Sequence, residues 1–177
     1  MLPAGASYEN PKSGARVEVI EMTPEVLRFE RLYKPHTGRA GAHLHRDFTQ
    51  SWELISGRGR FELDGKERDL APGESAEIAL EQPHRDLFNP FDEDAVARFR
   101  LEPCNKFVET FFETLAWLFK RGKLDDQDGF AQLQLFVILH ATNAQSFAAG
   151  PPIAVQKAIL PIAAWIGKLR GYQARYE

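Results

Sequence analysis

Two different hydrophobic patterns divide the chain. Up to about residue 103, apolar and polar residues alternate in short segments separated by turn residues, which is typical of antiparallel β structure. The pair Asp64-Gly65 favours a tight hairpin, because glycine tolerates the positive φ that such a turn requires. Short strands at regular spacing predict a sandwich or a barrel. The expected strands are Val17–Met22, Val26–Tyr33, His43–His45, Gln50–Ser56, Gly59–Asp64, Ser75–Leu80 and Ala95–Glu102.

After Pro103 the apolar residues recur every three or four positions, which predicts helices with one apolar side. The first helix is expected to end at Gly122. Two more are expected over Phe130–Ala141 and Ile153–Leu169, and Pro161 should kink or divide the last one. We expect these apolar sides to form core or a dimer interface rather than a lipid-binding surface. The apolar positions of the first helix are Phe107, Phe111, Phe112, Leu115, Leu118 and Phe119.

Composition and charge narrow the possible partners. The 177 residues suffice for one domain with an appended segment. Lys and Arg number 22 against 25 Asp and Glu, so we expect a small-molecule ligand and neither nucleic acid nor a membrane as partner. The single cysteine, Cys104, cannot form an intramolecular disulfide, and the first residues lack the features of a secretion signal. We therefore expect a cytoplasmic protein.

Three histidines carry the candidate chemistry. His43 and His45 are separated by one residue, so both imidazoles lie on the same face if this segment is a strand. His84 follows Pro83, shortly after another expected strand. Three imidazole nitrogens can hold a transition metal at roughly 2.0–2.2 Å and leave positions open for water, substrate or oxygen. The alternative is a polar pocket in which the imidazoles bond to one another, to water or to backbone.

The strand over Gln50–Ser56 offers a fourth candidate ligand. If Gln50 points inward, the obvious carboxylate, Glu53, points outward and is out of register with the histidines. The nearest inward polar group is then a neutral amide, which could ligate a metal or orient a ligating imidazole. Outside this ligand set, the inward positions offer no clear carboxylate to manage a proton.

The histidine pair and its surroundings resemble the first motif of the cupin superfamily: Gly, His-x-His, three or four residues, Glu, six residues, Gly. Here the motif runs from Gly38 through His43 and His45 to Gln50 and Gly57. The spacing is kept, and the Glu is replaced by Gln.

The second cupin motif is also present in modified form. It resembles the stretch from Pro72-Gly73-Glu74 through Pro83-His84 to Asn89, in which the asparagine comes one residue later than the pattern asks. The segment Asn10-Pro11-Lys12-Ser13-Gly14 is similar to the opening of many bacterial single-barrel cupins.

The resemblance implies a mainly β protein of the bacterial single-domain cupin 2 type. A jelly-roll β-barrel is expected over residues 10–103, followed by a C-terminal α-helical extension over residues 104–177. The resemblance also implies one divalent transition metal ion (Fe, Zn, Ni or Mn) in the barrel. Its implied ligands are His43, His45, His84 and Gln50, although some cupins have lost their metal.

Other inward residues are candidates for a substrate pocket. Trp52, Phe61 and Phe99 fall at inward strand positions, where they could line the pocket or simply be core. Arg31 could present a cation to an acidic ligand. We also expect a homodimer, because outward apolar residues such as Ile55 would be exposed on a lone barrel.

We expect a metal-binding cupin of unknown substrate that acts as a small-molecule enzyme. Oxygen-dependent oxidation is favoured, because three neutral imidazoles leave the ion dicationic and able to bind an anionic substrate beside dioxygen. The alternative is a non-catalytic cupin that binds a small metabolite as a sensor or accessory protein, since one fold hosts many functions.

Overall fold

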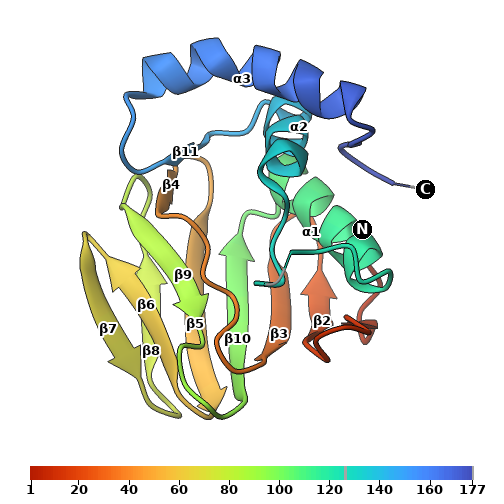
Figure 1. Cartoon of the computed structure of the whole chain (residues 1–177). Coiled ribbons are helices and arrows are strands. Elements are labelled where there is room, and N and C mark those ends of the chain that lie inside the picture. The colour runs from red at the N-terminus through yellow and green to blue at the C-terminus, as the bar shows by residue number, and fades with distance from the viewer. Residues whose placement is uncertain (126, 177) are drawn as a thin grey trace.

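Two antiparallel sheets face each other and form a jelly-roll barrel in the computed structural model, which describes residues 1–125 and 127–176 (Figure 1). Within these ranges, the first sheet has six strands in the order β1-β2-β3-β10-β5-β8, and the second has five in the order β11-β4-β9-β6-β7. From β3 to β10 the chain passes repeatedly from one sheet to the other, and only β6 and β7 of this stretch are consecutive strands of one sheet. The mainly β class with C-terminal helices is confirmed.

Every strand expected from the alternating pattern is present, with ends within two residues of the expected ones. The strands are β1 (Ser7–Glu9), β2 (Arg16–Met22), β3 (Leu27–Tyr33), β4 (His43–His45), β5 (Thr49–Ser56), β6 (Gly59–Leu63), β7 (Lys66–Leu70), β8 (Ser75–Ile78), β9 (His84–Phe88), β10 (Ala95–Glu102) and β11 (Ser146–Ala148).

Four strands, β1, β7, β9 and β11, were not expected from the sequence: β1 and β11 have only three residues, and β7 and β9 lack a clear alternation. In β7 every residue except Leu70 is exposed, because this strand lies at the edge of the second sheet. In β9 the two consecutive residues Leu87 and Phe88 are both buried. β11 is three residues long and pairs with β4, far away in the sequence.

Three helices follow the barrel strands among the described residues: α1 (Lys106–Phe119), α2 (Gln132–Thr142) and α3 (Ile153–Leu169). α1 begins after Asn105, whose side chain accepts a hydrogen bond from the backbone amide of Val108. α3 continues through Pro161 as one helix, so the proline does not divide it. Within the described residues, none of the helices combines the length and the apolar character needed to cross a membrane.

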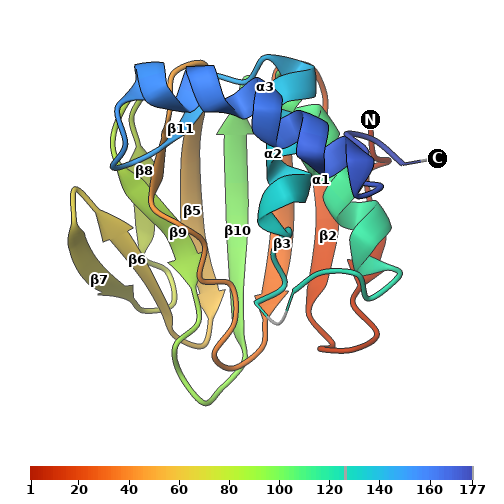
Figure 2. The ribbon, with the colours of Figure 1, turned by 45° about the horizontal axis from the view of Figure 1, so that its top comes forward.

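The helices cover one side and one end of the barrel. Phe112 of α1 lies 4.6 Å from Phe29 of β3, and Phe29 stacks on Phe99 of β10 at 4.8 Å between ring centroids. α3 lies across α2 (Figure 2), and Gln156 near its start is hydrogen-bonded to Ala148 of β11. Gly167 permits this close crossing, because a Cβ there would lie 2.7 Å from a methyl carbon of Val137.

The turn between β5 and β6 provides a test of the fold. Gly57 has a φ of 73°, and a Cβ there would overlap the backbone oxygen of Asp94. Gly65 has a similar φ of 77° but nothing within 4 Å of the added Cβ. We expect Gly65→Ala to lower the free energy of unfolding by about 1–2 kcal/mol, the strain of the left-handed conformation alone. Gly57→Ala should lower it by roughly 3 kcal/mol or more, because overlap adds to strain.

Urea unfolding followed by tryptophan fluorescence measures both changes. Equal losses for the two variants would contradict the tight packing assigned to Gly57.

Candidate metal centre

Two neighbouring strands bring the three histidines together. His43 and His45 alternate with Leu44 on β4, so their side chains lie on the same face. His84 is the first residue of β9 and pairs directly with His43 across the two antiparallel strands. The ring centroids lie 4.5 Å apart for His43 and His84, 4.8 Å for His43 and His45, and 5.0 Å for His45 and His84.

Backbone carbonyls fix the tautomers of two of these imidazoles. The Nδ1 atom of His43 lies 2.8 Å from the carbonyl oxygen of Gly41, and that of His84 lies 2.8 Å from the carbonyl oxygen of Gln82. A carbonyl can only accept, so each Nδ1 carries the hydrogen and each neutral ring has its lone pair on Nε2. Both rings therefore present a metal-binding nitrogen to the interior of the cluster.

The third imidazole is oriented by the C-terminal segment. Nδ1 of His45 lies 2.9 Å from the hydroxyl oxygen of Ser146, and the two residues are register partners in the β4–β11 pair. Ser146 was missed in the sequence analysis, because nothing near it in the sequence marks a contact with a residue a hundred positions earlier. The segment expected to be helical thus contributes a strand and a hydroxyl to the candidate site.

Two inward nitrogens of the cluster lack a partner among the described residues. Nε2 of His45 and Nε2 of His84 are buried, and neither has a hydrogen-bond partner among the described residues. Burial lowers the pKa of His45 well below its ordinary value, and the neighbouring imidazoles lower it further. Burial also lowers the pKa of His84, although Asp86 opposes this change. Unprotonated imidazoles are the form that binds a metal.

The spacing of these nitrogens fits a shared ion. One ligand nitrogen from each of His43, His45 and His84 lies within 4.8 Å of the other two. Donors bound to one ion at about 2.1 Å would lie roughly 3–4.2 Å apart, so only small adjustments are needed. The unpaired lone pairs and their spacing together fit a divalent transition metal.

A carboxylate that the sequence analysis missed lies beside the histidines. Asp86 follows His84 by two residues on β9, and its Oδ2 lies 3.7 Å from Nε2 of His43. Its Oδ1 lies 3.8 Å from Nε2 of His84. The expectation that the inward positions hold no carboxylate is therefore wrong. The spacing His-x-Asp would have indicated this placement if β9 had been identified as a strand.

Gln50 lies inward on β5, as its register predicts, and is 7% exposed. Its amide nitrogen donates a hydrogen bond to Oδ1 of Asp86. Glu53 points to the opposite face of the first sheet, where it forms an ion pair with Arg98 at 3.6 Å. The register argument about this strand is therefore confirmed for both side chains.

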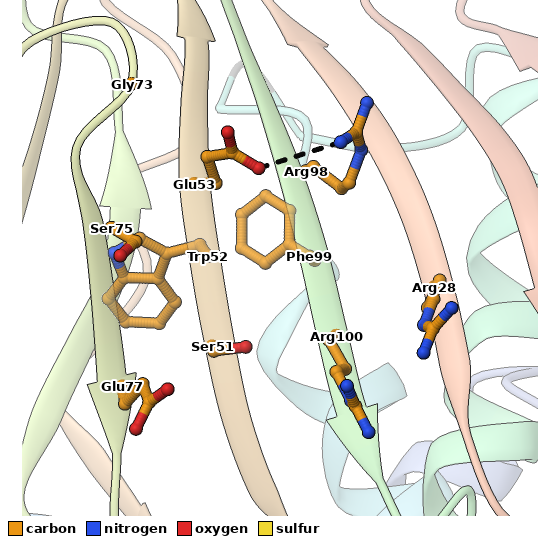
Figure 3. A pocket seen from close by; sticks show the side chains of 10 residues that line it. All are labelled: Arg28, Ser51, Trp52, Glu53, Gly73, Ser75, Glu77, Arg98, Phe99 and Arg100. Atoms are coloured by element: carbon orange, nitrogen blue, oxygen red, sulfur yellow. Dashed lines mark ion pairs between the residues drawn. The ribbon is translucent and has the colours of Figure 1, made fainter.

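The outer face of the first sheet carries a charged pocket that is separate from the histidines (Figure 3). Its cations are already matched with carboxylates: Arg28 lies 3.4 Å from Glu21, and Arg98 lies 2.7 Å from Glu30. Such exposed pairs contribute little energy, and the paired carboxylates weaken the attraction of these arginines for an anionic ligand. The histidine cluster is therefore the better candidate site.

Of the four candidate pocket residues, three lie together near the histidines and Arg31 lies elsewhere. Trp52 lies next to the cluster, with its ring 6.2 Å from that of His84. Phe61 and Phe99 surround Trp52 at 5.7 and 6.0 Å between centroids. Arg31 instead lies over the ring of Tyr33 at 4.4 Å and donates to the backbone oxygen of Asp128. A role for these four side chains in a substrate pocket stays a prediction.

Comparisons with known proteins agree with the geometry. The Cupin domain family matches residues 29–99. No curated protein matches the chain. The solved structures similar to this chain include KdgF from Halomonas sp., at 18% identity and a TM-score of 0.47, covering 54% of this chain and 84% of that one.

Two further structures are similar over the same part of the chain. An RmlC-like cupin from Shewanella frigidimarina is 17% identical with a TM-score of 0.46, covering 54% of this chain and 82% of its own. A Cupin 2 conserved barrel domain protein from Salinispora arenicola is 19% identical with a TM-score of 0.42, covering 51% and 76%.

Proposed function

This chain belongs to the cupin superfamily through its barrel, and from that premise we propose that His43, His45 and His84 hold one divalent transition metal ion. The observation that carries the proposal is the pair of buried Nε2 atoms, on His45 and His84, that lack a partner among the described residues. Buried polar atoms are almost always satisfied, so an unmatched pair facing the same point indicates a missing partner. A metal supplies Lewis acidity and open coordination positions there.

Metal content tests this proposal directly. Wild-type protein purified without a His tag or chelator should contain close to one equivalent of Fe, Zn, Ni or Mn, measured by plasma mass spectrometry. His43→Ala should contain less than about 0.1 equivalents, because loss of one of three ligands removes most of the affinity.

His36→Ala is the matched control for this measurement. His36 is exposed, pairs with Asp92 and should not affect metal content. Wild-type protein that contains no metal and takes up none on titration would refute metal binding.

We propose further that the centre serves a small-molecule enzyme. The ring of Trp52 lies 6.2 Å from that of His84, so the indole can form part of the wall of a pocket beside the cluster. His43 and Asp86 are partly exposed, which leaves a path from solvent to the site. The alternative remains a non-catalytic cupin that binds a metabolite.

Oxygen-dependent oxidation is the reaction class we favour, and Asp86 introduces a second candidate. Three neutral imidazoles support binding of an anionic substrate and dioxygen at adjacent positions. Proton-transfer chemistry was disfavoured, however, because the sequence indicated no carboxylate near the ligands. Asp86 lies 3.7 Å from His43, so isomerisation or hydrolysis becomes the second candidate.

Metal dependence separates these two reactions. Anaerobic reconstitution with Fe(II), followed by an oxygen electrode, should show oxygen uptake with one of a panel of catechols, flavonols, β-diketones, thiols and keto acids. Oxidation requires a redox-active metal, so the Zn(II) protein should show none. Turnover that continues without oxygen, or is fastest with Zn(II), would favour the second candidate.

The barrel over residues 10–103 and the extension over residues 104–177 are proposed as the two parts of the chain. All three helices lie in the second part, whereas β11 of that part joins the second sheet. Cys104 is free and buried, which supports the proposed cytoplasmic location.

We propose that a second copy of the chain covers α3. Ile162 is 61% exposed and Leu169 is 68% exposed, which is unusual for such large apolar side chains. Five of the exposed apolar residues of α3 follow one another at intervals of four, three, four and three residues, which is the spacing of the seam between two paired helices. Lys157 and Lys168 are on another side of the helix, so no charges face each other across the contact. The α3 seam consists of Val155, Ile159, Ile162, Ile166 and Leu169.

Sedimentation velocity at micromolar concentration should show a wild-type dimer. Ile162→Glu should give a monomer, because a buried, unpaired carboxylate in the α3 seam strongly destabilises the contact. Lys157→Glu, a charge change away from the seam, should leave the dimer intact. A wild-type monomer would refute the proposal, and binding of that monomer to phosphatidylserine vesicles would identify a lipid surface as the occupant instead.

A further inference from the structure

We propose that Asp86 is the fourth protein ligand of the metal centre and that Gln50 is the residue that positions its carboxylate. The inference rests on the proposed binding of a metal by the three histidines. It replaces the expectation that the amide of Gln50 completes the ligand set.

The distances between the carboxylate of Asp86 and the imidazoles fit donors that share one ion. The carboxylate oxygens of Asp86 lie 3.7 Å from Nε2 of His43 and 3.8 Å from Nε2 of His84. Both separations are too long for hydrogen bonds. They lie within the roughly 3–4.2 Å expected between two donors that share an ion at about 2.1 Å. Asp86 is therefore placed to bind the same ion as the imidazoles, and as a ligand it would not be the free carboxylate that isomerisation or hydrolysis requires.

The negative charge of Asp86 is not balanced by a lysine or arginine among the described residues. No lysine or arginine of the described residues lies within ion-pair distance of Asp86, and its partners in that range are His43 and His84. The tautomers set by the carbonyls of Gly41 and Gln82 direct lone pairs, not hydrogens, from these rings toward the carboxylate. A carboxylate facing lone pairs is unfavourable unless a cation lies among them, and a divalent ion supplies that cation.

The side-chain amide of Gln50 is oriented as a hydrogen-bond donor to Asp86. A carboxylate only accepts hydrogen bonds, so the amide nitrogen of Gln50, rather than its oxygen, must face Asp86. An amide nitrogen with its hydrogens directed at a carboxylate is a donor and not a metal ligand. Gln50 is almost fully buried on β5, and Asp86 is on β9 of the opposite sheet, so this hydrogen bond holds the carboxylate from across the barrel.

Cobalt titration of the chelator-stripped full chain tests the assignment, because the visible spectrum of Co(II) depends on its ligands. Asp86→Asn keeps the side-chain shape and removes the charge, so it should weaken Co(II) binding by about 100-fold or more and shift the visible bands. Gln50→Ala should weaken binding by roughly 10-fold with a smaller spectral change, because it acts through Asp86.

Two further variants provide a control and a test of recovery. Asp92→Asn, an exposed carboxylate next to His36, is the matched control and should leave affinity and spectrum unchanged. The double variant Gln50→Glu with Asp86→Asn returns a carboxylate to the cluster from β5, and it should recover at least 10-fold of the lost affinity.

The outcomes separate this proposal from the one on which it rests. Wild-type protein that takes up no cobalt would refute the metal site itself and Asp86 with it. Wild-type binding that Asp86→Asn leaves unchanged in affinity and spectrum would refute only the role of Asp86. Circular dichroism in chelator checks folding. If Asp86→Asn is unfolded, Gln50→Ala tests the proposal in its place. Wild-type affinity of Gln50→Ala for Co(II) would then refute the proposal.

Discussion

One imidazole nitrogen from each of His43, His45 and His84 lies within 4.8 Å of the other two, and the inward lone pairs of His43 and His84 make this arrangement unfavourable unless a cation lies between them. The surrounding structure maintains this arrangement. Backbone carbonyls at Gly41 and Gln82 keep the hydrogens of His43 and His84 on the outer nitrogens. Burial keeps His45 from protonating, which would otherwise relieve the repulsion. The arrangement of the cluster thus fits the metal that we propose, and an arrangement that is unfavourable without its ligand is typical of a functional site.

The two sheets of the barrel contribute different parts of this centre. β4 and β9 of one sheet supply the histidines and Asp86, whereas β5 of the other supplies Gln50. The hydrogen bond between Gln50 and Asp86 therefore joins the sheets at the site. A change that separates the sheets would move Gln50 away from the carboxylate that it holds, so barrel closure and site geometry are coupled.

The C-terminal segment has two physical roles. Through β11 it adds an edge strand beside β4 and places the hydroxyl of Ser146 against His45. Through α3 it presents an apolar surface to solvent, on the side of the helix opposite its contact with α2. One chain segment thus contacts both a proposed ligand and a proposed subunit interface.

The sequence by itself determined most of the barrel strands, the helices and the three histidines, because periodicity and the spacing His-x-His are local properties of the chain. Only the tertiary structure decided which groups complete the site. Asp86 lies on a strand without alternation, and Ser146 is a hundred positions away from His45. The partner of Gln50 was likewise undecided until both sheets were in place. Contacts between distant segments follow from sheet order and register, which local patterns do not encode.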